Sequence, residues 1–234
     1  EFIGCCLNPN IKLEKVLCCV GSGFNGKSVF FETMLAMLGE NNVTSYNINS
    51  LCDDKGYSRI MIKNKLLNYS SDFNGKIFAN GIFKQLTSGE PVEARRLYKE
   101  PEIVRNYARL AFNCNSMPSS ADTSFGFRRR LLLILFNKKI DKGKADPDLA
   151  KRLKTELPGI LVWAIRLGRF IRNGKKLSRS STLEILEQAY KEDTDTVVMF
   201  LSARKCNPDN DNKIGLTSLF NTYREYCKDN SLKP

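Results

Sequence analysis

The chain is 234 residues long, enough for one large domain or two small ones with a hydrophobic core. Hydrophobic residues make up 42% and charged residues 26%, and the longest apolar run, Leu131 to Phe136, is strand-sized, which excludes a membrane-spanning helix. The 37 lysines and arginines outnumber the 25 acidic residues and give a formal net charge of +12. This excess suits a polyanionic partner or an ordinary basic surface.

The chain contains 8 cysteines and no histidine. Cys5 and Cys6 are adjacent, as are Cys18 and Cys19, so they cannot supply the C-x-x-C spacing of a zinc knuckle. We therefore expect reduced, buried thiols in an intracellular protein. The opening at Glu1 lacks a basic start and a cleavage site, so we expect a piece of a longer protein with no visible targeting segment.

In chain order, residues 1–14 predict a short helix that breaks near Asn8, Pro9 and Asn10. An apolar run from Val16 to Val20 follows, then a glycine-rich turn, and then apolar residues at helical spacing up to Gly39. This pattern predicts a strand, a turn and a helix. The segment from Val43 to Ile48 predicts a short strand or a loop.

The turn matches the pattern G-x-x-x-x-G-K-[ST], which consists here of Gly21, Ser22, Gly23, Phe24, Asn25, Gly26, Lys27 and Ser28. Its glycines allow consecutive backbone N–H groups to close around phosphate oxygens, and the N-terminus of the following helix favours negative charge. In this motif Lys27 reaches the β and γ phosphates of ATP, and Ser28 holds a magnesium ion. The alternative is a turn in an ordinary strand–helix unit, which would leave Lys27 and Ser28 without a role.

A phosphate-loop enzyme needs a second carboxylate at the end of a strand beside the first, to hold Mg²⁺ through water and polarise the attacking water. Asp72 follows the segment Leu66–Tyr69 and is the only acidic residue between Asp54 and Glu90, so it is the candidate by elimination. The predicted strand is weak because polar residues interrupt it, and a loop aspartate that caps the next segment is the alternative.

The next stretch predicts a helix that ends at Gly89 and two strands, Val92–Tyr98 and Ile103–Asn113, around a turn. Basic and aromatic side chains lie near the tip of this strand pair. Such a tip can contact the phosphates of DNA, or it can be a solvated hairpin. The candidate DNA-binding residues are Arg95, Arg96, Tyr98 and Lys99.

Asn115 comes just after the second strand, where an amide can hydrogen-bond the γ phosphate or the attacking water. Farther on, three arginines precede another apolar strand: Arg128, Arg129 and Arg130. Arginine stabilises the charge on a transferring phosphoryl group, and a neighbouring subunit can supply it. The alternative is an ordinary basic strand edge.

These motifs, in this order, resemble the helicase half of phage and plasmid primase-helicases, the satellite-phage and poxvirus primase class of superfamily three helicases. The resemblance spans nearly the whole chain, and Asn25, just before Gly26, is typical of that class. The segments that carry it are GSGFNGKS at 21–28, FKQLTSGEPVEARRLYKEP at 83–101, FNCNSMP at 112–118, FRRRLLLILF at 127–136 and ELPGILVWAIRLGRFI at 156–171.

The resemblance implies an α/β fold with a P-loop AAA+-type ATPase core that assembles as a ring, usually a hexamer. Such a ring moves along single-stranded DNA and unwinds forked DNA ahead of a primase region, expected upstream in the same polypeptide. By position, Lys27 and Ser28 form the Walker A pair, Asp72 is the Walker B acid, and Asn115 is the sensor. Arg129 or Arg130 is the finger that enters the next subunit's site.

Two further points follow from the resemblance. Lys99 falls in the hairpin that enters the central channel in this class. Asp72 departs from the family, which usually has a glutamate or an acidic pair, so the identity of the catalytic base stays open.

The sequence predicts three regions: an ATPase core over residues 1–145, a helical extension over 146–177, and a helical or partial winged-helix region over 178–234. In the extension a break at 157–159 precedes an apolar stripe, which we expect to be core. The stripe consists of Ile160, Trp163, Ala164, Leu167 and Phe170. After a polar linker at 178–181, helices are predicted over 182–191, 195–205 and 216–229.

The sequence thus predicts the ATP-dependent DNA helicase domain of a phage or plasmid replication protein that uses ATP and Mg²⁺. We expect it in the cytoplasm of the host cell, with no membrane partner. The alternative is an AAA-type ATPase that acts on a protein or as a loader, and stimulation of ATP hydrolysis by single-stranded DNA separates the two. A basic DNA-binding module with a degenerate ATPase would leave Lys27, Asn115 and the arginines unexplained.

Overall fold

A computed structural model describes residues 1–73, 81–115, 117–118, 124–178, 184, 195–206 and 213–230. The chain divides into two units, Glu1–Arg179 and Ser180–Pro234, and each is described by itself. Across the ranges above, no helix is long and apolar enough to cross a membrane.

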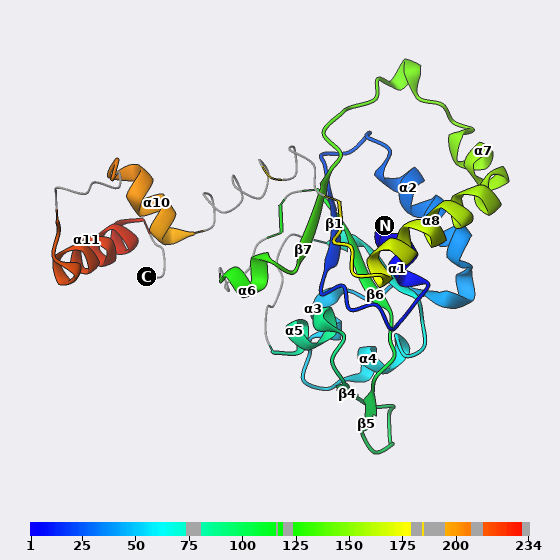
Figure 1. Ribbon diagram of the computed structural model, residues 1–234, viewed down its shortest axis with the longest axis horizontal. Helices are drawn as coiled ribbons and strands as arrows, with labels where there is room; N and C mark the ends of the chain where they lie inside the picture. The colour runs from blue at the N-terminus through cyan, green and yellow to red at the C-terminus, as the bar shows by residue number, and fades with distance from the viewer. Residues whose placement is uncertain are drawn as a thin grey trace. The chain divides into compact units, whose positions relative to one another are not determined.

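The first unit is built on a five-stranded parallel sheet with the strand order β2-β3-β6-β1-β7 (Figure 1). The interior strand β1, between β6 and β7, is buried along its whole length, as expected for a parallel sheet that helices cover on both faces. The strands are β1 (Val16–Val20), β2 (Val43–Thr44), β3 (Leu67–Phe73), β6 (Arg109–Cys114) and β7 (Leu131–Leu135).

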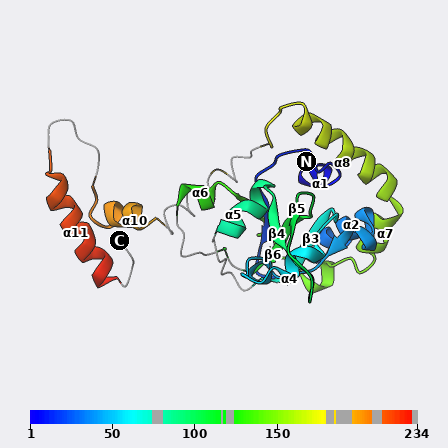
Figure 2. The same cartoon turned by 90° about the horizontal axis from the view of Figure 1, so that it is seen from below.

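Helices form a layer on each side of this sheet. Figure 2 shows α1, α2, α7 and α8 on one side, and α5 and α6 on the other. The helices of this unit are α1 (Phe2–Cys6), α2 (Lys27–Leu38), α3 (Ile48–Leu51), α4 (Tyr57–Met61), α5 (Gly81–Ser88), α6 (Phe125–Arg128), α7 (Leu149–Thr155) and α8 (Leu157–Arg172). Two short 3-10 helices, Glu40–Asn42 and Lys142–Lys144, lie in the connections.

The core beneath α2 joins alternate residues of the strands to apolar side chains of α1 and α2. Leu17 and Cys19 of β1 pack there with Phe31 of α2, whose ring stacks on Tyr69 of β3 with centroids 4.1 Å apart. The opposite layer contributes Phe83 and Phe127, whose rings lie 5.6 Å apart. The predicted strand–turn–helix from Val16 to Gly39 is confirmed.

The predicted strand pair differs from the structure. β4 (Val92–Ala94) and β5 (Glu102–Val104) form an antiparallel hairpin, but a single second strand over Ile103–Asn113 is wrong, because β6 is a separate strand in the parallel sheet. Between β5 and β6, the Ala108 N–H donates to the carbonyl of Ile62 at 3.0 Å, and the Tyr107 hydroxyl donates to the carbonyl of Glu90 at 2.7 Å. These bonds turn the chain out of the hairpin and into the sheet.

The predicted strand before Asp72 is longer than expected. β3 continues through Asp72 to Phe73, so the polar residues do not interrupt it. Asn68 is fully buried, yet its side chain accepts from the backbone N–H of Tyr46 and donates to the carbonyl of Tyr46, both at 2.8 Å. Because its amide is satisfied in this way, Asn68 is compatible with a buried strand.

The apolar stripe predicted on α8 is only partly core. Ala164 is buried, but Trp163 and Phe170 are 59% and 58% exposed, so the expectation for these two aromatic residues is wrong. The buried face of α8 is set by a close contact of Ala164 and Gly168 with Gly4 of α1. The helix break comes at Glu156, one residue early, and Pro158 lies in the first turn of α8, where proline is tolerated.

The second unit contains α10 (Thr196–Ala203) and α11 (Leu216–Asp229), close to two of the predicted helices. Phe200 packs edge-on against Tyr223, with ring centroids 5.6 Å apart, and Cys227 completes the small core. The helix predicted over 182–191 lies outside the described residues, apart from position 184.

Candidate active site

The glycine-rich loop follows β1, where the N–H of Gly21 donates to the carbonyl of Cys114 at the end of β6, at 3.0 Å. A Cβ at Gly21 would lie 2.3 Å from Asn25 Nδ2 and 2.4 Å from the carbonyl oxygen of Phe136, so only glycine fits. Gly23 and Gly26 have φ of 98° and 85°, which other residues rarely adopt. The loop therefore depends on its glycines.

The loop leads directly into the N-terminus of α2, which begins at Lys27. Within the described part of the chain, no group accepts a hydrogen bond from the backbone N–H groups of residues 22–27. Free N–H groups at a helix N-terminus attract anions through their dipoles and through the helix dipole. This arrangement fits a phosphate group.

Two side chains brace the loop from within. Asn25 Nδ2 donates to the carbonyl of Phe136, just beyond β7, at 2.8 Å, while its Oδ1 accepts from Lys27 Nζ at 3.2 Å. Lys27 also donates to the carbonyl of Gly21 and is only 4% exposed. Lys27 is thus held inside the loop by the loop's first glycine and by an amide anchored to the neighbouring strand.

The other predicted catalytic groups reach the same edge of the sheet. Val20 of β1 and Phe73 of β3 both pair with Cys114 of β6, so the carboxyl ends of these strands are level. Asn115 follows Cys114 and is exposed, and Asp72 is the last but one residue of β3. Lys27, Ser28, Asp72 and Asn115 therefore belong to one edge of the sheet.

The strand that carries Asp72 does not adjoin β1, and the expectation that it would is wrong. β6 lies between them, so Asp72 is two strand spacings, about 10 Å, from the axis of β1. The pairing of β3 with β6 also shifts register between Ser70 and Phe73, a bulge that includes Asp72. Bulges often occur beside active sites, where they re-aim side chains. The side chain of Asp72 lies outside the described part of the structure.

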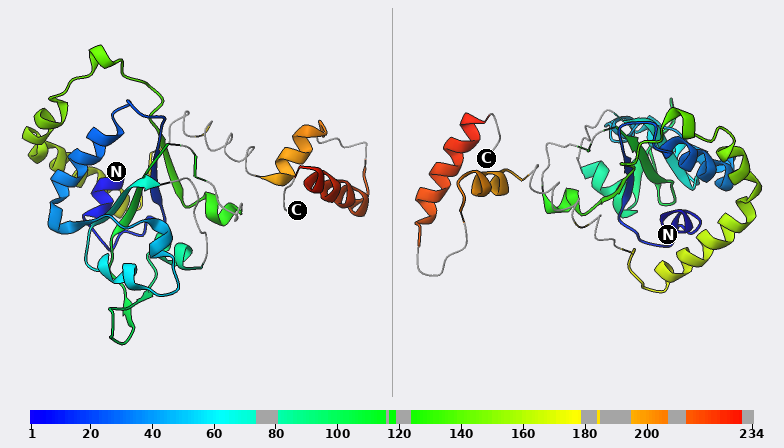
Figure 3. Two further views of the ribbon diagram at one scale, coloured as in Figure 1. Left: turned by 180° about the vertical axis from the view of Figure 1, so that it is seen from behind. Right: turned by 90° about the horizontal axis from the view of Figure 1, so that it is seen from above.

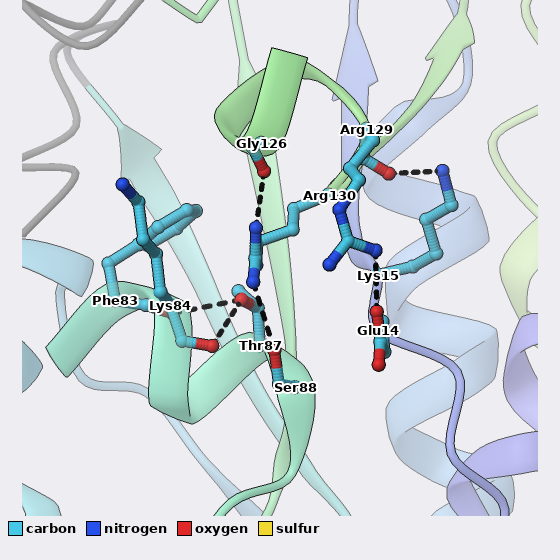
Figure 4. Close-up of polar contacts among 9 residues, drawn as sticks. All are labelled: Glu14, Lys15, Phe83, Lys84, Thr87, Ser88, Gly126, Arg129 and Arg130. Atoms are coloured by element: carbon cyan, nitrogen blue, oxygen red, sulfur yellow. Dashed lines mark hydrogen bonds and ion pairs between the residues drawn. The ribbon is translucent and has the colours of Figure 1, made fainter. Parts of the chain in front are cut away.

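The two candidate finger arginines have different surroundings (Figure 4). Arg130 is 9% exposed; it donates to the carbonyl of Gly126 and to Ser88 Oγ, the latter at 3.2 Å. Its Nε is a buried polar atom that has no hydrogen-bond partner among the described residues. Arg129 is 40% exposed and pairs with Glu14 at 2.6 Å, a contact that holds the pKa of Glu14 below its usual range.

Both arginines lie at the amino edge of the sheet, opposite the phosphate loop. The carbonyl of Arg130 accepts from the N–H of Val16, the first residue of β1, at 2.8 Å. The whole length of β1, five residues or about 16 Å, therefore separates these arginines from the loop of their own chain. The structure does not bring Arg129 or Arg130 together with Lys27.

The hairpin of β4 and β5 lies at the end of the sheet where β6 begins (Figure 1). At its tip Tyr98 is fully exposed with a φ of 59°, and Arg96 and Lys99 beside it are exposed. The Arg95 guanidinium lies over the ring of Tyr57, 5.8 Å from its centre. The tip thus presents an aromatic ring and cations to solvent, while Arg95 lies against α4.

Sequence reasoning missed the residue that supports this hairpin. Arg59 of α4 is 3% exposed; its Nε donates to the carbonyl of Glu93 in β4 at 2.6 Å, and its Nη1 to the carbonyl of Leu51 at 3.0 Å. The one available signal was a lone charge in the otherwise apolar run around Ile60. Glu14, the partner of Arg129, was also missed.

The thiols show no metal-binding cluster with the other described residues. Seven of the 8 cysteines are buried, and burial raises the pKa of Cys6, Cys19 and Cys52 to about 12. Across the described ranges, no three His, Cys, Asp or Glu side chains cluster as metal ligands. Neutral, buried thiols act here as small apolar side chains.

The sheet, the glycine loop at the end of β1 and the helix after it define a P-loop core of mixed α/β fold, which confirms the fold class expected from the sequence. A family model described as a family of unknown function (DUF5906) matches residues 19–130. A protein of Acanthamoeba polyphaga mimivirus named "Putative helicase L207/L206" is 25% identical over 98% of this chain. The chain spans only 26% of that relative's length.

Two solved structures of the NrS-1 C-terminal region share the fold. The first, an A form apo structure, has a TM-score of 0.61 at 14% identity and covers 84% of this chain and 46% of that one. The second, of NrS-1 residues 305–718, has a TM-score of 0.57 at 14% identity and covers 83% of this chain and 46% of the other. At this identity the likeness concerns the fold.

Proposed function

We propose that this chain is the ATP-hydrolysing domain of a DNA helicase, in which a ring of subunits, usually six, translocates on single-stranded DNA. The domain belongs to a phage or plasmid replication protein of the superfamily three type, which also carries a primase region. It acts on forked DNA. The observation that carries the proposal is the phosphate loop, because its free N–H groups and enclosed Lys27 fit a nucleotide phosphate. The similarity to a mimivirus protein named as a helicase supports the choice among P-loop ATPases.

In this proposal the backbone of residues 21–26 binds the phosphates of ATP, and Lys27 neutralises their charge. Ser28 and Asp72 hold Mg²⁺, which when bound draws charge from the transferring phosphoryl group. Asn115 orients the γ phosphate or the attacking water from the strand in between.

The position of the arginines supports the ring in this proposal. Because Arg129 lies at the opposite edge from its own loop, it can meet a nucleotide only in a neighbouring subunit. Its half-exposed position favours Arg129 over the buried Arg130 as the finger. In the hairpin, Lys99, Arg96 and Tyr98 contact the DNA that passes through the ring.

The test measures ATP hydrolysis with and without single-stranded DNA, together with unwinding of a forked duplex. We expect DNA to stimulate hydrolysis and unwinding to require ATP and Mg²⁺. A rate of ATP hydrolysis that DNA does not change but a protein substrate raises would favour the alternative, an AAA-type ATPase that loads or remodels a protein. A folded chain with no nucleotide binding would refute both.

A further inference from the structure

One face of α8 carries large apolar side chains and arginines that are exposed to solvent in the described part of the chain. Trp163 and Phe170 are more than half exposed, and Val162 is 48% exposed. Arg166 and Arg169 are exposed on the same side and form no ion pair with any described residue. We call these five residues the outer face of α8.

The orientation of this face is fixed by the contact between α8 and α1. A Cβ at Gly4 would lie 2.0 Å from the carbonyl oxygen of Ala164, and one at Gly168 would lie 2.6 Å from the carbonyl oxygen of Gly4. The two backbones touch, so α8 cannot rotate to bury other residues. At 100° per residue, Arg166 is roughly opposite this contact, with Trp163 and Phe170 on one flank and Val162 and Arg169 on the other.

Figures 2 and 3 both show α1 on the inner side of α8, between it and the sheet. The outer face therefore belongs to the surface of the first unit. α8 and the segment after it, residues 157–178, contain no aspartate or glutamate, but they contain five exposed cations: Arg166, Arg169, Arg172, Lys175 and Lys176. These five cations outnumber the two acidic groups at the ends of this segment, Glu156 at the start of α8 and Glu1, which accepts from Ser178.

Exposed aromatic rings beside cations indicate which kind of partner this face can bind. Cations attract phosphates, and exposed aromatic rings and arginine planes stack on unpaired bases, which makes both features typical of surfaces that bind single strands. A helix that enters a membrane surface keeps its apolar residues at the centre of one face. Here Arg166 occupies the centre and both rings lie on one flank of it, so α8 fits a strand that offers charge and flat bases side by side.

We propose that the outer face of α8 is a second binding site for single-stranded nucleic acid, separate from the β4–β5 hairpin. Its arginines contact backbone phosphates, and Trp163 and Phe170 stack on bases. The site requires neither nucleotide hydrolysis nor the hairpin. It would hold a strand on the outside of the ATPase core.

Trp163 is the only tryptophan of the chain, so its fluorescence reports on this face alone. The experiment titrates the full chain with oligothymidylate in the absence of ATP, on a Lys99→Ala background that weakens the hairpin. We expect saturable quenching of Trp163, and no quenching by polyphosphate, which offers charge without bases. Phe170→Ala should weaken binding about tenfold, within the usual effect of one base-stacking ring.

The matched comparison uses two double variants with equal loss of charge. Arg166→Ala with Arg169→Ala should reduce the salt dependence of binding by about 1.4 units of slope, at 0.7 for each lost phosphate contact. Lys12→Ala with Lys151→Ala removes two exposed cations elsewhere and should leave the slope and the quenching unchanged. Thermal melting of both variants establishes that they are folded.

Three results would overturn the proposal. Oligothymidylate that binds, as judged by anisotropy of a labelled strand, without quenching Trp163 would place the strand elsewhere. Trp163 emission that shifts with protein concentration alone, in parallel with self-association, would make the face an interface between copies. Quenching by phosphatidylserine vesicles that exceeds quenching by oligothymidylate would assign the face to a membrane surface.

Discussion

At the scale of single residues, Lys27 is buried but its bonds are made within the loop, to Gly21 and Asn25. Lys27→Ala should abolish ATP hydrolysis, with a loss of about 100-fold or more, because in the proposed function no other group supplies its charge to the transferring phosphoryl group. The melting temperature should change little, since the loop lies outside the main core. Turnover and melting measured on the same sample test this, and wild-type hydrolysis by a folded variant would refute the phosphate-loop assignment.

Arg130 and Arg129 should contribute differently to the stability of the fold. Arg130→Ala should lower the free energy of unfolding by about 2–4 kcal/mol, because it strips partners from Ser88 and Gly126 and opens a cavity. Arg129→Ala should change it by less than about 1 kcal/mol, since its pair with Glu14 is half exposed. Urea unfolding of the two variants provides the comparison. Equal destabilisation would contradict the environments described.

At the scale of elements, sequence patterns predicted the helices and strands that depend on interactions between residues close together in the chain. The strand–loop–helix from Val16 to Gly39 was correct because its apolar periods and glycines leave one conformation for each segment. The break between β5 and β6 was missed because it depends on distant partners, such as Ile62 for Ala108. The rotation of α8 was missed because the Gly4–Gly168 contact joins the two ends of the unit. The order of β3, β6 and β1 likewise follows from tertiary pairing.

The hairpin carries a prediction at this same scale. Lys99 lies at an exposed tip, so Lys99→Ala should lower affinity for single-stranded DNA of any sequence. It should also flatten the salt dependence by about 0.7 units of slope and slow unwinding, whereas hydrolysis without DNA should stay near normal. A salt titration checks this, and identical slopes for variant and wild type would favour a solvated hairpin without a DNA contact. Arg59, beneath the hairpin, provides no such control, because its loss would disturb the fold.

At the scale of the whole molecule, the buried thiols should make the folded chain less stable at alkaline pH. In the folded chain the pKa values of Cys6, Cys19 and Cys52 are about 12, whereas an unfolded thiol has a pKa of about 8.5. Above that value the unfolded chain releases protons that the folded chain retains. The free energy of unfolding should therefore fall from about pH 9 towards pH 12, by at most about 1.4 kcal/mol per pH unit for each thiol.

Urea unfolding of the first unit, followed by Trp163 fluorescence between pH 7 and pH 10.5, measures this slope. Cys52→Ala should make it shallower above pH 9. Cys206→Ser should leave it unchanged, because Cys206 is exposed. An equal slope in all three proteins would show that the buried thiols do not cause the effect.

In the proposed ring, the opposite placement of the phosphate loop and Arg129 would make each active site shared between neighbouring subunits. If each interface pairs the loop of one subunit with the arginine of the next, Lys27→Ala and Arg129→Ala proteins should each be inactive alone. Mixing equal amounts should restore activity at about a quarter of the interfaces, where an intact loop faces an intact arginine in a head-to-tail ring. ATP hydrolysis measured against mixing ratio should peak near equal amounts. No recovery between subunits shown to exchange would mean that Arg129 only supports the edge of the sheet through Glu14, and that another residue completes the site.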